Sequence, residues 1–70
     1  MKTITFGEWA RINRVKQGLT FQAVADAAGT SKSLIYETET GKTTPNLATA
    51  EKIAAALGYR LSEALAKCGR

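Results

Sequence analysis

The sequence predicts a small all-α domain built from five short helices, and three observations support this. Apolar residues recur at spacings of three and four along most of the chain, which is the helical period. Ser, Thr or Asn stands where four of the helices are expected to begin, and these residues accept hydrogen bonds from free backbone N–H groups. Glycine follows three of the expected helices, at Gly18, Gly29 and Gly58, where a helix end favours positive φ.

Length and charge restrict the classes of protein that this chain can be. Its 70 residues allow a single domain, residues 1–70, which is marginal unless its helices pack well or it dimerises. Ten Lys and Arg against six Asp and Glu give a net charge of +4, which is typical of a domain that binds a polyanion. No apolar run approaches the length of a membrane span, and the chain does not open with a signal-peptide pattern.

The reactive residue types are scarce. The chain has one cysteine, Cys68, and no histidine, which excludes a disulfide framework and leaves no zinc ligand set. Cys68 is interpreted as a bystander thiol near the C-terminus. We find no catalytic constellation, and we therefore expect no enzyme activity, no metal and no cofactor. A reducing bacterial cytoplasm is the expected location.

The first helix is predicted to follow a short N-terminal arm, residues 1–5. Thr5 and Glu8 have the spacing of a capping box, and Ile4 and Trp9 occupy the two positions of a hydrophobic staple around it. The helix should begin at Phe6 and end near residue 17. Trp9 and Ile12 form a second apolar edge, which we expect to pack on the arm or on the C-terminal helix rather than on a partner.

Residues 19–41 contain two short helical patterns joined at Gly29. Thr20 is the expected cap of the first, and its apolar face consists of Val24, Ala25 and Ala28. Ser31 is the expected cap of the second, in which Leu34 and Ile35 stand among polar residues. Two helices of about two turns joined by a turn containing glycine form a helix-turn-helix signature. The polar residues of the second helix form no Glu–Lys pairs at i, i+4, which favours a surface that reads base edges and phosphates over a merely solvated one.

Two more helices are predicted after a polar loop at residues 40–45. Asn46 should cap a helix over residues 47–57, and a last helix should run from Leu61 to about Lys67. The apolar stripe of the longer helix consists of Leu47, Ala50, Ile53, Ala54 and Leu57. The predicted core consists of Ala10, Val24, Ala25, Ile35, Leu47, Ile53 and Leu57.

Residues 6–66 resemble the DNA-binding domain of phage Cro and repressor proteins, the lambda-repressor-like family. The matching residues are Arg14, Gly18, Leu19, Thr20, Val24, Ala25, Gly29, Ser31, Ile35, Glu39, Thr40, Gly41, Pro45, Leu47, Ile53, Ala54, Leu57 and Gly58. The resemblance implies a five-helix core over about residues 6–67, with the helix-turn-helix formed by helices 2 and 3.

The resemblance also implies roles for particular residues. Arg14 and Glu39 would form a structural ion pair, with a phosphate contact of Arg14 as the less favoured alternative. The residues expected to read bases are Lys32, Ser33 and Glu37, with Tyr36 beside them. Lys32 suits guanine and Glu37 suits cytosine N4. The residues expected to contact the DNA backbone are Phe21, Gln22, Ser31, Lys42, Thr43 and Thr44.

Phe21 stands where the family commonly has glutamine, the residue that assists a phosphate contact. Gln22 lies one place later, so the side-chain contact to phosphate is in doubt while the backbone contact remains open. Three alternatives follow for Phe21: it covers a sugar, packs against the first helix, or serves a protein partner.

The leading functional hypothesis is a sequence-specific regulator that binds double-stranded operator DNA as a homodimer, with helix 3 in the major groove. The expected dimer interface is apolar and consists of Tyr59, Leu61 and Leu65. The alternative is an antitoxin that binds a toxin partner and autoregulates its operon. Residues 59–70 are short for wrapping a toxin, which makes this alternative weaker.

Overall fold

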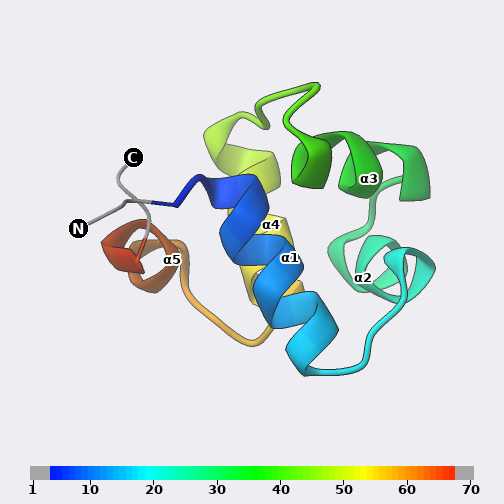
Figure 1. The fold of residues 1–70 in the computed structure, drawn as a ribbon, viewed down its shortest axis with the longest axis horizontal. Coiled ribbons are helices and arrows are strands. Elements are labelled where there is room, and N and C mark those ends of the chain that lie inside the picture. The colour runs from blue at the N-terminus through cyan, green and yellow to red at the C-terminus, as the bar shows by residue number, and fades with distance from the viewer. Residues whose placement is uncertain (1–3, 68–70) are drawn as a thin grey trace.

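The computed structural model describes residues 4–67, and these residues form five helices and no strand. The first three residues of the predicted arm and Cys68 lie outside the described residues. The helices are α1 (Phe6–Lys16), α2 (Phe21–Ala28), α3 (Lys32–Thr40), α4 (Leu47–Ala56) and α5 (Leu61–Lys67), and their arrangement is shown in Figure 1. The predicted five-helix fold is confirmed.

The predicted caps account for where the first four helices begin. Thr5, Thr20, Ser31 and Asn46 each accept a hydrogen bond from the backbone N–H three residues further on. At α1 the capping box is complete, because Glu8 Oε1 also accepts from the Thr5 N–H at 2.9 Å. α5 begins without a Ser, Thr or Asn cap. The backbone N–H of Arg60 instead donates to Glu63 Oε1 at 2.8 Å.

The helices pack around one apolar core. α2 contacts α3 and α4, α1 contacts α3 and α5, and α4 contacts α5 (Figure 1). The core consists of Trp9, Ala10, Val24, Ala25, Ala28, Ile35, Ile53, Ala54, Leu57 and Ala64. Six of the seven predicted core residues are buried, which confirms most of that prediction.

Leu47 is the exception, and its prediction is wrong. Its side chain is 72% exposed, whereas Ala50, Ile53 and Ala54 of the same helix are buried. Leu47 is the first residue of α4. Because side chains lean toward the N-terminus of their helix, a first-turn residue points past the packed part of the helix. Helical spacing alone does not reveal this end effect.

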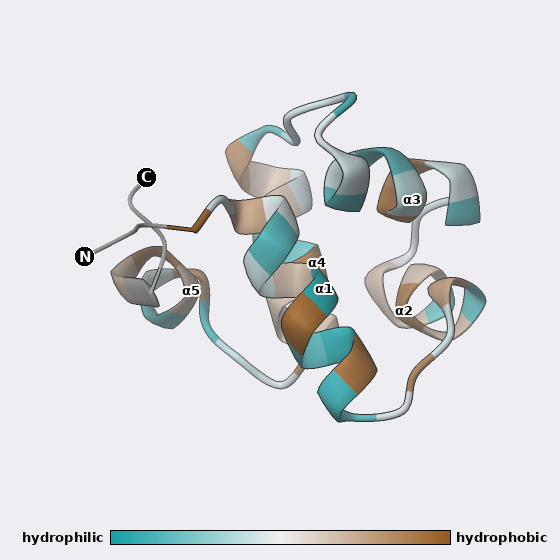
Figure 2. Cartoon of the chain, in the orientation of Figure 1, coloured by the Kyte–Doolittle hydropathy of each residue, from teal (hydrophilic) through white to brown (hydrophobic). Residues whose placement is uncertain are grey.

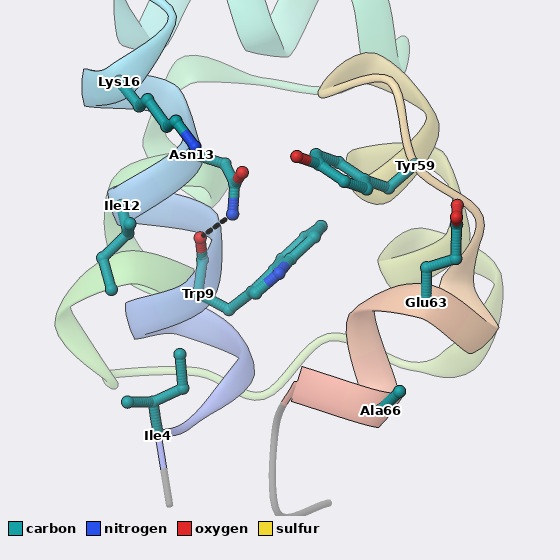
Figure 3. Close-up of a pocket in the computed structure, with 8 residues that line it drawn as sticks. All are labelled: Ile4, Trp9, Ile12, Asn13, Lys16, Tyr59, Glu63 and Ala66. Atoms are coloured by element: carbon teal, nitrogen blue, oxygen red, sulfur yellow. Dashed lines mark hydrogen bonds between the residues drawn. The ribbon is translucent and has the colours of Figure 1, made fainter.

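Of the second apolar edge on α1, only one residue is buried. Trp9 is buried and its ring makes an edge contact with the Tyr59 ring, with centroids 5.3 Å apart. Ile12 is 51% exposed, so its predicted packing on the arm or on the C-terminal helix is wrong. Ile12 lies on the side of α1 away from the Trp9 and Tyr59 rings (Figure 3).

α1 and α3 approach each other closely at Gly7. A Cβ atom on Gly7 would overlap the carbonyl oxygen of Thr38 on α3. Glycine costs about 1 kcal/mol relative to alanine inside a helix, but here it allows two backbones to meet. The absence of a side chain at Gly7 therefore permits the close contact between α1 and α3.

Candidate nucleic-acid interface

The turn between α2 and α3 has the geometry that a helix-turn-helix needs. Gly29 ends α2 with φ of 70°, in the left-handed region that glycine adopts without a Cβ clash. The Thr30 N–H then donates back to the Ala25 carbonyl at 2.9 Å, which closes the turn. Ser31 begins α3 immediately afterwards, and its Oγ accepts from the Leu34 N–H at 3.1 Å.

One face of α3 is packed and the opposite face is open to solvent. Ile35 and Thr38 are buried against the core. Most of α3 is coloured hydrophilic or neutral in Figure 2, with only a short hydrophobic segment. The exposed residues include the four expected to read bases, namely Lys32, Ser33, Tyr36 and Glu37. These four line an open cavity of about 510 Å³ together with Phe21 from α2.

The polar groups on this open face are available for a ligand. Among the described side chains, Arg14–Glu39 is the one ion pair. No hydrogen bond within residues 4–66 engages the side chains of Lys32, Ser33, Tyr36 or Glu37. A cation, a hydroxyl, a phenol and a carboxylate therefore face solvent together, and between them they offer both donors and acceptors.

The N-terminus of α2 lies beside this face. Thr20 Oγ1 accepts from the Ala23 N–H at 3.0 Å, and helical geometry leaves the N–H groups of Phe21 and Gln22 without an intrahelical acceptor. The Gln22 side chain is already engaged, because its Nε2 donates to Asp26 Oδ1 at 2.8 Å. The backbone is thus better placed than the Gln22 amide to meet an anion here.

The other residues expected to contact the DNA backbone lie at the two ends of α3. The Ser31 hydroxyl accepts the cap hydrogen bond and keeps its own O–H to donate. After α3, the Lys42 N–H donates to the Glu37 carbonyl at 2.9 Å, which ties the loop to the helix end. Lys42 and Thr44 are exposed and Thr43 is half-buried.

The Arg14 guanidinium is held on three sides. Its Nε donates to Glu39 Oε2 at 2.7 Å and its Nη2 to Glu39 Oε1 at 3.1 Å, which is a two-bond fork. Its Nη1 donates to the Leu19 carbonyl at 2.9 Å. The Arg14 and Glu39 side chains are only 13% and 3% exposed. This geometry is the ion pair that the resemblance implied, and it leaves little of the guanidinium for a phosphate.

Phe21 makes two contacts, of which the one with the first helix could be anticipated from the sequence and the one with Tyr36 could not. The Arg14 Cζ atom lies 4.2 Å from the centre of the Phe21 ring, so Phe21 packs against the first helix, one of its three predicted alternatives. The Phe21 ring also meets the Tyr36 ring edge-on, with centroids 5.8 Å apart. Arg14, Phe21 and Tyr36 come from three different helices, and no local pattern brings them together.

A second open surface lies between α1 and α5, on the side of α1 away from α3 (Figure 1). It contains a cavity of about 580 Å³. The residues that line it, drawn in Figure 3, are Ile4, Trp9, Ile12, Asn13, Lys16, Tyr59, Glu63 and Ala66. The buried Asn13 side chain has a hydrogen-bond partner, because its Nδ2 donates to the Trp9 carbonyl at 2.9 Å.

The three residues expected at a dimer interface differ in exposure. Leu61 is partly buried against the core. Tyr59 and Leu65 are each 36% exposed, and part of the Tyr59 ring is already used by its contact with Trp9.

Two further searches of residues 4–67 found nothing. None of the helices there is both long enough and apolar enough to cross a membrane. No group of three or more Cys, Asp or Glu side chains within those residues could hold a metal ion together.

The fold and the open face of α3 define a helix-turn-helix DNA-binding domain of the class found in transcriptional regulators. The chain belongs to the helix-turn-helix family of Cro and C1-type repressors, whose sequence model matches residues 11–63. No curated protein matches the chain significantly in sequence.

Several solved structures are similar to this chain, and two of them illustrate the likeness in fold and sequence. One is the DNA-binding domain of the P22 C2 repressor, with a TM-score of 0.85 and 28% identity over 93% of this chain and 86% of that one. The other is the restriction-modification controller protein C.AhdI from Aeromonas hydrophila, with a TM-score of 0.79 and 29% identity over 84% of this chain and 89% of that one.

Proposed function

We propose that this protein regulates transcription in the bacterial cytoplasm by binding an operator in double-stranded DNA as a homodimer. The observation that carries the proposal is the open face of α3, where the side chains of Lys32, Ser33, Tyr36 and Glu37 make no hydrogen bond or ion pair with the described residues and lie around one cavity. α3 would enter the major groove with its first turn toward the base edges, the docking geometry of helix-turn-helix proteins.

Each polar residue of this face suits a particular contact. Lys32 would donate to O6 and N7 of guanine, Ser33 would donate or accept, and Glu37 would accept from N4 of cytosine. Glu37 would be repelled by a phosphate, so a base edge is its favourable partner. The α2 N-terminus, Ser31 and the Lys42–Thr44 loop flank α3 and would contact the phosphates that position it.

One short helix contacts only a few base pairs, too few to specify a single site in a genome. A dimer would double the number of base pairs that are recognised. A two-fold dimer places two α3 helices in successive major grooves, about 34 Å apart. The dimer contact would use Tyr59, which lines the cavity between α1 and α5, together with Leu61 and Leu65 of α5. A toxin partner at that same surface is the alternative, and it would make DNA binding autoregulatory.

Selection of binding sites from random double-stranded DNA tests the proposal. The full chain should enrich an inverted repeat whose half-site centres are one helical turn apart, and footprinting on the DNA upstream of its own gene should protect a matching site. A variant with Lys32 and Glu37 both changed to Ala is the control, and it should enrich no such repeat. Equal affinity of the unaltered chain for random DNA and for the selected DNA would overturn the proposal.

A further inference from the structure

Four side chains form a continuous row from the interior of the domain to the open face of α3. Glu39 accepts two hydrogen bonds from Arg14, and the Leu19 carbonyl accepts a third. The guanidinium of Arg14 in turn lies over the Phe21 ring, and the Phe21 ring meets the Tyr36 ring at an interplanar angle of 80°. The inner end of the row is nearly buried, while Tyr36 at the outer end is 48% exposed.

The row restrains Tyr36, a side chain that would otherwise be mobile. Exposed side chains change rotamer within picoseconds to nanoseconds, and no hydrogen bond among the described residues holds the Tyr36 hydroxyl. The edge-on contact with Phe21 is a favoured arrangement of two aromatic rings. Phe21 is itself restrained, because a guanidinium fixed by three hydrogen bonds covers its face.

We propose that Phe21 is a positioning residue for DNA reading, which sets the orientation of the Tyr36 ring and thereby the base preference at the pair that Tyr36 meets. The inference rests on the proposed function, since it gives Tyr36 a base-pair partner. Phe21 lines the same cavity as Tyr36, Lys32, Ser33 and Glu37, so the ring it holds stands among the other base-reading groups. A ring held in one orientation favours one base edge, such as the methyl group of thymine, whereas a mobile ring discriminates less.

The first test uses the free protein. In NMR spectra, the Tyr36 ring protons should show chemical shifts displaced by the neighbouring Phe21 ring, and Phe21→Leu should remove that displacement. Phe21→Tyr keeps an aromatic ring and should restore it. Tyr59 is the internal control, because its ring contacts Trp9 and should keep its shifts in every variant that remains folded. Tyr36 shifts that are the same with Phe and with Leu at position 21 would overturn the proposal.

The second test uses DNA. Binding to the selected site and to its single-base variants should be measured for the unaltered chain, Phe21→Leu, Tyr36→Ala and the double variant. Each single variant should lose preference at the same base pair by about 2- to 12-fold, which is the range of one aromatic pair. The double variant should lose no more than Tyr36→Ala alone, and Phe21→Tyr should retain the preference.

The outcomes separate this inference from the proposed function. A chain that binds its site and keeps its preference at the Tyr36 base pair after Phe21→Leu would overturn the inference alone. A uniform loss of affinity across all base variants would also overturn it, because a merely structural role for Phe21 predicts that result. A chain that binds no DNA, while Tyr36 shifts still depend on Phe21, would overturn the proposed function and the DNA-reading role together.

Discussion

Lys32 and Lys42 are both exposed lysines on the proposed DNA surface, but their surroundings differ. Lys32 is the first residue of α3 and lines the cavity beside Ser33 and Tyr36. Lys42 lies in the loop beyond the end of α3, next to two threonines. Their positions predict two kinds of contact, one with a base edge and one with a phosphate.

Replacing each lysine by alanine should separate the two roles. Lys32→Ala should cost about 1–3 kcal/mol on the operator and relax preference at one base pair, because it removes a contact to a base edge. Lys42→Ala should weaken binding about equally on operator and random DNA. Titrations of both variants on both DNAs measure this, and identical behaviour of the two variants would contradict the division.

Arg14 should matter more for folding than for DNA contact. Arg14→Ala leaves the Glu39 carboxylate, which is 3% exposed, without its partner. Loss of one partner from a buried pair costs about 3–5 kcal/mol, which lowers the Tm of a domain of this size by at least about 10 °C. Thermal unfolding followed by circular dichroism measures the effect. An unchanged Tm with lost DNA binding would restore the phosphate-contact interpretation.

At the scale of the helices, local signals in the chain were sufficient to predict where most elements begin. A cap hydrogen bond joins residues three apart, so Thr5, Thr20, Ser31 and Asn46 act within a few residues of themselves. α5 lacks such a residue, and the side chain of Glu63 takes over by accepting from the Arg60 N–H. How α1 meets α3 is a different matter, because it depends on residues far apart in the chain.

Gly7→Ala tests the contact between these two helices. Alanine is normally the better helix former by about 1 kcal/mol, so a free α1 would be stabilised. Here the added Cβ overlaps the Thr38 carbonyl oxygen, and overpacking of this kind costs about 1–3 kcal/mol. We therefore expect a lower denaturation midpoint in urea. A higher midpoint would mean that α1 and α3 do not approach as closely as described.

At the scale of the whole molecule, we expect net charge and dimerisation to govern DNA binding. The chain carries a net charge of +4, and the proposed phosphate contacts flank α3 at both ends. A homodimer would double these contacts and leave α1 between the DNA surface and the dimer surface. Both the role of charge and the role of dimerisation can be tested by measurements on the intact protein.

DNA affinity should fall steeply with salt concentration. If each protomer neutralises about four phosphates, the log–log slope for the dimer should be roughly −7, from about −0.9 for each phosphate. Fluorescence anisotropy at several salt concentrations measures the slope. An affinity that does not change with salt concentration would show that the excess positive charge does not contact DNA phosphates.

Dimerisation should depend on the C-terminal surface. Leu65→Lys places a charge on a residue of α5 that is 36% exposed and should weaken self-association without unfolding the domain. Leu47→Lys is the matched control, since Leu47 is 72% exposed at the start of α4 and lies outside the proposed interface. Sedimentation of the free proteins, and of Leu65→Lys with operator DNA, gives the result. If the unaltered chain and Leu65→Lys sediment identically and bind a half-site one to one, the dimer is excluded.

Several properties of this protein follow from short stretches of its chain. The helix starts and the turn at Gly29 arise from interactions between residues close together in the chain, so the local sequence is enough to predict them. The polar character of α3 follows directly from its composition. The family resemblance extended this reading to the Arg14–Glu39 pair, whose two members lie 25 residues apart. Most of the core was also predictable, because helical spacing identifies the buried face of each helix.

Other properties depended on which helices meet. The close contact at Gly7 and the cavity between α1 and α5 result from packing between helices distant in the chain. The exposure of Leu47 and Ile12 depends on where the neighbouring helices leave each side chain uncovered. The same holds for Phe21, whose partners Arg14 and Tyr36 belong to α1 and α3. A periodic pattern indicates which side of a helix is apolar. It does not indicate which helix packs on that side, or which of the apolar residues remain exposed. Only the packed structure supplies that information.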